Sequence, residues 1–151
     1  MNEDAKKRAL AILEKRDVSR QMLLDKLKEK DISPADAEEV ADWLGSLGVI
    51  DDERFASLVV RHYAAKGYGE KRIREELYRR GIDRALWDAA LREMPEADDT
   101  VFRLYAQKLR GTDGGDAARR RAQNYLLRRG YSWDEVRLAA ERFQRETEEE
   151  A

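Results

Sequence analysis

The chain lacks cysteine entirely, which excludes disulfide bridges and thiolate metal sites. Its one histidine, His62, has no partner at metal-ligand or catalytic spacing and lies on an apolar helical stripe, so we expect it to be packed. No apolar run approaches the length of a membrane span, and the first residues lack the apolar core of a signal peptide. These absences predict a cytoplasmic protein with no metal, no cofactor and no membrane association.

Proline is also scarce, with two residues in 151, and the nine glycines fall mainly between segments of helical periodicity. No segment alternates convincingly with period two, so we expect no β-sheet. Charged residues of both signs make up 41% of the chain and are interspersed, as on solvated helices. The sequence therefore predicts an all-α fold.

One pattern recurs three times, at a period of about fifty residues, in residues 24–33, 74–83 and 123–132. Each copy has an anchor leucine, basic residues, a turn residue, one apolar residue and a helix-capping residue. The turn residue is glycine in the second and third copies but Asp31 in the first. The equivalent leucines, which we expect to be buried, are Leu27, Leu77 and Leu126.

Nine helices are predicted, three in each of three repeats of about fifty residues. Apolar stripes are expected to include Leu47, Leu58 and Trp133, and Asp116 is expected to cap the second helix of the third copy. The predicted units are three tandem three-helix repeats over residues 1–49, 50–96 and 97–151, the last with an acidic C-terminal tail. Stacked repeats form an elongated curved array with an extended surface, which favours a binding protein over an enzyme.

The formal net charge of −2 hides an uneven distribution of charge along the chain. Residues 1–60 carry 10 basic and 14 acidic side chains, whereas residues 101–130 carry 8 basic and 2 acidic ones. Residues 131–151 are acidic again, with 3 basic and 7 acidic side chains. A basic island of this kind attracts phosphates or acidic protein surfaces, and salt weakens that attraction.

The basic residues fall into two groups. On the helix after Gly69, basic and acidic residues alternate at intervals of four: Lys71 and Arg72, then the acids at 75 and 76, then Arg79 and Arg80. This spacing favours a solvated helix face with paired charges. On the helix from Asp116 the arginines have no later acid within reach, which favours an external anionic partner. The candidate contact residues are Lys71, Arg72, Arg79, Arg119, Arg120, Arg121, Arg128 and Arg129.

Helical geometry places Arg121 and Arg128 on one side of their helix, with Asn124 between them. Three aromatic residues, Tyr68, Tyr131 and Trp133, lie beside basic residues at the repeat junctions. They can stack on nucleic-acid bases, but we favour a packing role between repeats. The acidic cluster at residues 51–53 is explained by a helix start, so we predict no metal there.

Three segments carry a resemblance to a known family: GVIDDERFA at 48–56, GYGEKRIREEL at 67–77 and SRQMLLDKL at 19–27. With them, the chain resembles the RecX family of bacterial RecA regulatory proteins. The resemblance implies three tandem three-helix repeats and no catalytic activity. It also implies a protein that binds RecA, lies in the groove of the RecA–DNA filament, and restrains its recombinase, ATPase and coprotease activities, in DNA repair and the SOS response.

A second function remains open, because helical repeats with a basic island are also typical of direct nucleic-acid binders. In that case the basic island would retain DNA without RecA. In either case we expect a monomer with weak, sequence-independent and salt-sensitive DNA binding.

Overall fold

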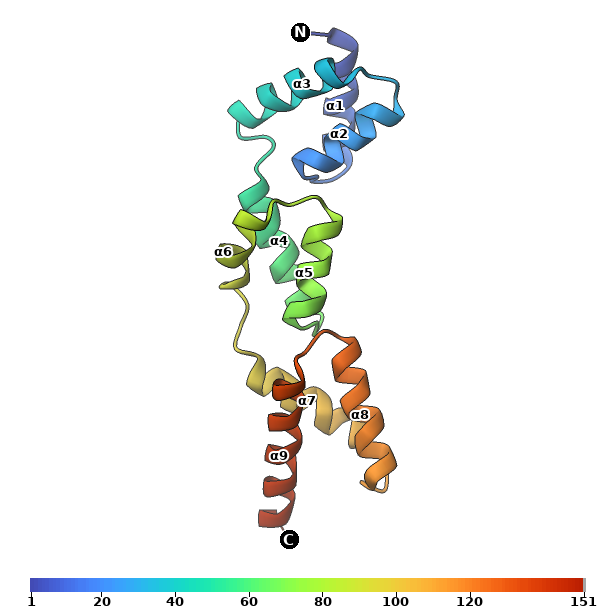
Figure 1. Ribbon diagram of the computed structural model, residues 1–151, viewed down its shortest axis with the longest axis vertical. Helices are drawn as coiled ribbons and strands as arrows, with labels where there is room; N and C mark the ends of the chain where they lie inside the picture. Colours follow the sequence, from blue (N-terminus) through green and yellow to red (C-terminus); the bar gives the residue numbers. More distant parts are fainter. Residues whose placement is uncertain (151) are drawn as a thin grey trace. The chain divides into compact units, whose positions relative to one another are not determined.

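The computed structural model describes residues 1–150, and all of the regular secondary structure in this range is helical (Figure 1). The predicted all-α class is confirmed. The elements in chain order are α1 Glu3–Lys15, α2 Arg20–Glu29, α3 Pro34–Ser46, α4 Asp52–Ala65, α5 Glu70–Arg79, the 3-10 turn η1 Arg84–Leu86, α6 Trp87–Leu91, α7 Ala97–Leu109, α8 Asp116–Arg128 and α9 Trp133–Glu150. Ala151, the last residue of the third predicted repeat, lies outside the described residues.

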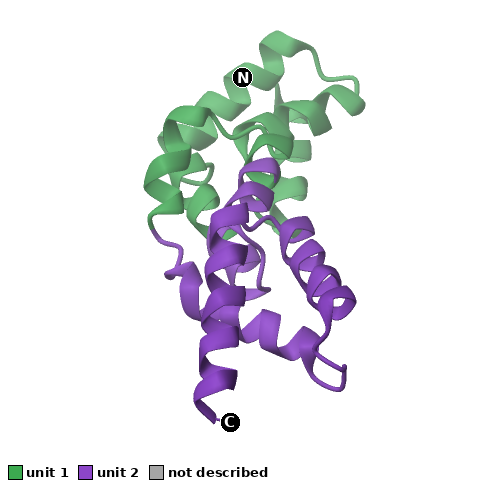
Figure 2. Cartoon of the chain, turned by 60° about the horizontal axis from the view of Figure 1, so that its bottom comes forward, with its two compact units in different colours: residues 1–59, 76–92 green, residues 60–75, 93–151 purple. Residues whose placement is uncertain are grey.

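The chain divides into two compact units (Figure 2). The first unit contains residues 1–59 and 76–92, and the second contains residues 60–75 and 93–151. The division passes through α4 and α5, so each unit holds one complete three-helix repeat and part of the middle one. The boundaries predicted for the three repeats remain a prediction.

Serine side chains cap the start of three of the helices. The Met22 amide donates to Ser19 Oγ at 3.1 Å, and the Asp36 amide donates to Ser33 Oγ at 3.2 Å. Ser132 forms a reciprocal pair with Glu135, in which each backbone amide donates to the other side chain, at 2.8 and 3.1 Å. Each of these hydroxyls accepts from an amide that the helix itself leaves unpaired, so the capping is encoded locally.

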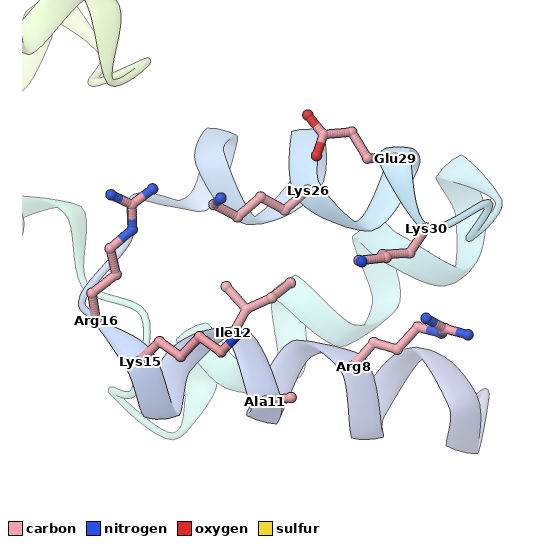
Figure 3. A pocket seen from close by; sticks show the side chains of 8 residues that line it. All are labelled: Arg8, Ala11, Ile12, Lys15, Arg16, Lys26, Glu29 and Lys30. Carbon is pink, nitrogen blue, oxygen red and sulfur yellow. The ribbon is translucent and has the colours of Figure 1, made fainter.

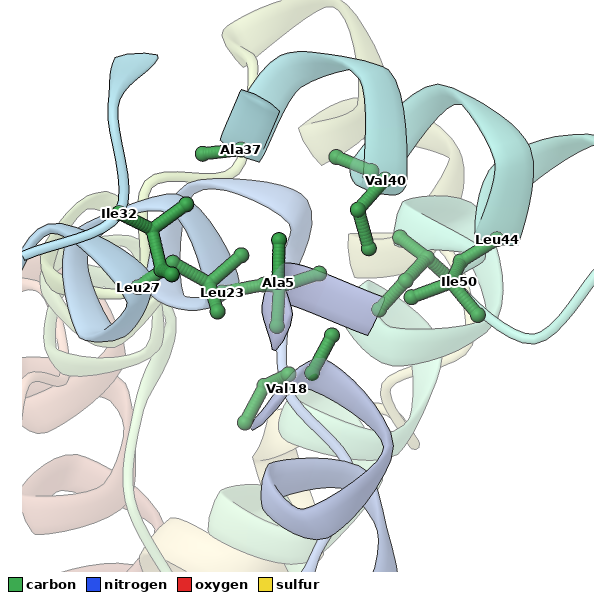
Figure 4. Packing of buried hydrophobic residues seen from close by; sticks show 11 residues of the cluster. Ala5, Val18, Leu23, Leu27, Ile32, Ala37, Val40, Leu44 and Ile50 are labelled. Atoms are coloured by element: carbon green, nitrogen blue, oxygen red, sulfur yellow. The ribbon is translucent and has the colours of Figure 1, made fainter. Parts of the chain in front are cut away.

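The core of the first repeat is built from one face of each of α1, α2 and α3 (Figure 4). Ala5 of α1 lies against Leu23 and Leu27 of α2, and Val40 and Leu44 of α3 complete the cluster. All five are almost fully buried. Small side chains on α1 let its backbone approach α2 and α3 closely, and the leucines supply most of the apolar area removed from water.

The third repeat has an equivalent core formed by α7, α8 and α9. Val101, Tyr105, Leu126 and Val136 are buried there, and Phe143 packs edge-on against the Tyr105 ring with centroids 5.5 Å apart. Leu27, Leu77 and Leu126 are each 0% exposed, which confirms the position predicted for the anchor leucine of every repeat.

Several predicted details are wrong. Leu47, Leu58, His62 and Trp133 are exposed rather than packed. Leu47 and Trp133 lie at the ends of α3 and α9, beyond the packed part of each helix, whereas Leu58 and His62 lie beside the buried face of α4. Helix α8 begins at Asp116 and is preceded by Gly115, so Asp116 occupies the first turn and does not cap the helix.

The third helix of the middle repeat also differs from the prediction. Asp83 accepts from the Ala85 amide at 2.9 Å, but this capping starts the 3-10 turn η1, which then continues into the short helix α6. At the C-terminal end of the described residues, residues 148–150 are part of α9.

The turn that follows the second helix of a repeat contacts the preceding repeat. In the first unit, a Cβ placed on Gly81 would lie 2.5 Å from Gln21 Cβ, at the start of α2. In the second unit, a Cβ on Gly130 would lie 2.5 Å from the backbone nitrogen of Arg72, at the start of α5. Both glycines have positive φ, +70° and +99°. Glycine is therefore required twice over, by the backbone conformation and by the space.

The equivalent turn of the first repeat contains Asp31, the only non-glycine residue with positive φ in residues 1–150, at 62°. Aspartate tolerates the left-handed region better than most side chains. The Asp31 side chain is exposed, whereas a Cβ on Gly81 or Gly130 would overlap the neighbouring helix. The space at this turn therefore allows a residue other than glycine.

Candidate functional site

A shallow basic groove of about 320 Å³ runs between α7 and α8 in the second unit. Its lining residues are Lys108, Thr112, Ala118, Arg121, Ala122, Asn124, Tyr125 and Arg128. We call this surface the α7–α8 groove. Three of its lining side chains are cationic and none is acidic, so its electrostatic potential is positive.

The predicted pair Arg121 and Arg128 is brought together in this groove, with Asn124 between them. Both arginines are exposed, and within residues 1–150 neither has an ion-pair partner. Unpaired guanidinium groups repel one another and are suited to bind carboxylate or phosphate through two parallel hydrogen bonds. The arrangement is that of an anion-binding surface.

Lys108 is a further cation of the groove that sequence reasoning missed. Its Nζ lies 4.0 Å from the centroid of the Tyr125 ring, which holds the ammonium group at the groove by a cation–π contact. Lys108 comes from α7 and the arginines come from α8, so no spacing within one helix connects them.

Arg119 and Arg120, which precede Arg121 on α8, differ from each other. Arg119 forms an ion pair with Asp116 at 2.7 Å, and both partners are more than one-third exposed. Arg120 is exposed and has no ion-pair partner within the described part of the chain. An exposed ion pair contributes little to stability, so the guanidinium groups of Arg119 and Arg120 both remain accessible to an anion.

Arg129 has a structural role. It lies at the joint between the second and third repeats, within the second unit, where its guanidinium donates to the carbonyl oxygens of Lys66 and Gly67. The same group stacks over the Tyr68 ring, with 4.0 Å from Cζ to the ring centroid. An arginine held in this way is far less available to an external ligand than Arg121 or Arg128.

Tyr131 completes the same joint. Its hydroxyl donates to the Gly67 carbonyl at 2.8 Å, and burial of the ring raises the pKa of Tyr131 to about 12. Two backbone hydrogen bonds connect the segments, from the Gly69 amide to the Arg129 carbonyl at 2.7 Å and from the Lys71 amide to the Gly130 carbonyl at 3.1 Å. The packing role expected for Tyr68 and Tyr131 is confirmed, whereas Trp133 is 58% exposed.

The candidates on α5 are more constrained than those on α8. Arg79 forms an ion pair at 3.2 Å with Glu76, which is only 3% exposed and is also paired with Arg80. Arg72 Cζ lies 4.9 Å from the Tyr68 ring centroid, and the Lys71 side chain is exposed. A buried carboxylate needs its partners, so Arg79 and Arg80 contribute to folding before they contribute to any contact.

Within residues 1–150, no group of three or more His, Cys, Asp or Glu side chains could hold a metal ion. None of the helices in this range combines the length and the apolar character needed to cross a membrane.

Two family models match the chain, one described as the first three-helix domain of RecX, over residues 5–44, and one as its second three-helix domain, over residues 51–91. A regulatory protein RecX from Xanthomonas campestris pv. campestris (strain B100) is 39% identical over 135 residues, which cover 87% of this chain and 83% of the relative. The regulatory protein RecX from Vibrio campbellii is 32% identical over 137 residues, covering 89% and 88% of the two chains.

Solved structures agree on the fold. A crystal structure of RecX from Lactobacillus salivarius superposes with a TM-score of 0.85 at 23% identity, over 93% of this chain and 95% of that one. A second crystal structure, of a regulatory protein RecX, gives a TM-score of 0.82 at 22% identity, over 91% and 72% of the two chains. The three-helix units match the family models, and relatives of this identity extend over nearly the whole chain, so the protein belongs to the RecX family of regulatory proteins.

Proposed function

We propose that this protein binds RecA and the RecA–DNA filament and restrains the recombinase, ATPase and coprotease activities of RecA. Membership of the RecX family supports this proposal, since the relatives are regulatory proteins. The observation that carries the contact site is the α7–α8 groove, where three cations and no acid face an open hollow. Its anionic partner would be an acidic surface of the filament or a nearby phosphate.

The proposed mechanism needs no catalytic group. The first and third three-helix repeats each have their own core and offer separate contact surfaces on one chain. Linked contacts bind more tightly than any of them does alone. A chain that contacts neighbouring RecA protomers would favour one conformation of the filament over another. Inhibition is then expected with less than one molecule of this protein per RecA protomer.

The test is a titration of the protein into RecA hydrolysing ATP on single-stranded DNA. The informative variant is R121E/R128E, because neither arginine has a partner within residues 1–150 whose loss would disturb the fold. A matched control is K7E/K28E, which changes the net charge by the same amount at two exposed lysines of the first repeat. We expect inhibition by the wild type and by the control, and weaker inhibition by R121E/R128E.

Absence of inhibition by the wild-type protein at every ratio would refute the proposed function. Full inhibition by R121E/R128E would leave the function standing and would remove the α7–α8 groove from the contact site. Charge reversal at Arg79 is a less clear test, because it would place two carboxylates beside each other at the buried Glu76.

Direct DNA binding is the second candidate function, and the unpaired α8 arginines favour it. A pull-down of the protein on RecA filaments, with RecA and DNA each omitted in turn, separates the two functions. Retention on DNA alone would support the direct binder, and retention only when RecA is present would support the RecA regulator. The variant R119E/R120E/R121E should weaken any retention on DNA across all sequences.

A further inference from the structure

A second basic groove lies between α1 and α2 in the first unit (Figure 3). Its volume is about 430 Å³. The residues that line it are Arg8, Ala11, Ile12, Lys15, Arg16, Lys26, Glu29 and Lys30. We call it the α1–α2 groove. It is unexpected, because residues 1–60 carry 10 basic and 14 acidic side chains and are acidic as a whole.

The cations of this groove are not neutralised where they face it. Glu29 is the one acid among the lining residues, and its carboxylate points away from α1 (Figure 3). Arg8 is partly neutralised by Asp4, at 3.2 Å. The four remaining cations have no ion-pair partner within residues 1–150; they are Lys15, Arg16, Lys26 and Lys30.

The unpaired cations of this groove suit a line of negative charges. From Arg8 to Arg16 the wall formed by α1 is about 12 Å long at about 1.5 Å per residue. A nucleic-acid strand carries one negative charge for each nucleotide, so a groove of this length can face more than one phosphate. Four unpaired cations from two helices can therefore neutralise successive phosphates of one strand.

The remaining lining side chains show what the groove does not recognise. Ala11 and Ile12 are its only apolar side chains, and no aromatic residue is available to stack on a base. Contacts would therefore be made to the backbone and would carry no sequence information. A protein partner would bring an apolar interface core, and the one alanine and one isoleucine of this groove offer that core little area to bury.

We propose that the α1–α2 groove is a nucleic-acid site, in which Lys15, Arg16, Lys26 and Lys30 bind the phosphodiester backbone independently of base sequence. This site belongs to the first repeat and is separate from the α7–α8 groove of the third. It does not depend on the proposed regulation of RecA.

The test uses the full-length chain without RecA and a fluorescent oligothymidylate, whose binding is followed by anisotropy at several salt concentrations. The variant K15Q/K26Q removes one cation from each wall of the groove. The control K7Q/K28Q removes one exposed lysine from each of the same two helices, at positions outside the groove. Circular dichroism of both variants verifies that the helices are retained.

We expect K15Q/K26Q to reduce the slope of log affinity against log salt by about 1.4, since each phosphate contact with a single strand contributes about 0.7. The control should change the slope by far less. Equal slopes in the two variants, or no binding of the oligonucleotide by the wild type, would overturn the proposal. A labelled polyglutamate peptide provides the other arm: if K15Q/K26Q loses affinity for the peptide but not for the oligonucleotide, the groove is a site for acidic proteins and the proposal is wrong.

Discussion

Replacing Gly130 with alanine tests the joint between the second and third repeats. Gly130 has φ of +99°, and its Cα faces the start of α5. An added Cβ would lie 2.5 Å from the Arg72 nitrogen, 2.7 Å from Arg72 Cβ and 3.1 Å from Arg72 Cα. The two nearest distances are shorter than real Cβ contacts, and two of the three atoms belong to the backbone, so a side-chain rotation cannot relieve the overlap.

The expected cost has two parts. An alanine in a left-handed conformation costs about 1–2 kcal/mol. Separating the two segments would also lengthen the hydrogen bonds that the Gly69 and Lys71 amides donate across the joint. Each such bond contributes about 0.5–1.5 kcal/mol. Gly130→Ala should therefore lower the free energy of unfolding by about 2–5 kcal/mol, the sum of these two contributions.

A matched control separates the two parts. Gly111 belongs to the same unit and has φ of +78°, but a Cβ placed on it meets nothing within 4 Å. Gly111→Ala should therefore show only the conformational cost, about 1–2 kcal/mol. Urea unfolding followed by circular dichroism measures both variants, and the m-value verifies that the transition has kept its cooperativity. Equal losses for Gly130→Ala and Gly111→Ala would show that the close approach at the joint is not real.

Three other changes follow from the same structure. Leu77→Ala should lower the free energy of unfolding by about 2–5 kcal/mol, since Leu77 is fully buried; a loss below about 1 kcal/mol would contradict its place in the core. Asp31→Gly should be neutral or should stabilise by up to about 1 kcal/mol, because it relieves a positive φ at an exposed turn; clear destabilisation in urea would contradict this account. Burial raises the pKa of Tyr131 from 10.0 to about 12, so folding holds the phenol neutral, and the stabilisation is complete below pH 10 and is lost as the pH rises to 12. Unfolding free energies of the wild type should therefore fall more steeply over that range than those of Tyr131→Phe, and parallel curves would count against the pKa shift.

Local signals in the sequence were sufficient for the fold class and the anchor positions. Ser19 and Ser33 cap their helices through amides three residues away, so the interaction is encoded within one turn. The burial of Leu77 follows from a repeated pattern. The positions of Leu58 and His62 were predicted wrongly because the apolar residues of α4 fit two neighbouring stripes, and the buried one runs through Ala56 and Val60. Only the packing partners of α4 decide between them.

The candidate site was predicted in part, because spacing within one helix can be read from the sequence and contacts between helices cannot. Arg121 and Arg128 are seven residues apart on one helix, so their common side is a property of helical geometry. Lys108 joins them from another helix, and Arg129 donates to a carbonyl 62 residues away, neither of which spacing can reveal. The α1–α2 groove was missed because a net charge summed over sixty residues hides where each charge points.

The turn contacts at Gly81 and Gly130 also give the array of repeats a direction, because the two sides of each contact differ. Each joint takes its glycine from the later repeat and its contact surface from the second helix of the earlier one. A duplicated copy of the middle repeat would carry both sides of such a joint. Its glycine would contact the preceding repeat, and the start of its second helix would contact the following one. A copy of the first repeat inserted inside the array would bring the Asp31 side chain to a position where not even a methyl group fits. Lengthening of the array by duplication is therefore possible only with units that retain the glycine.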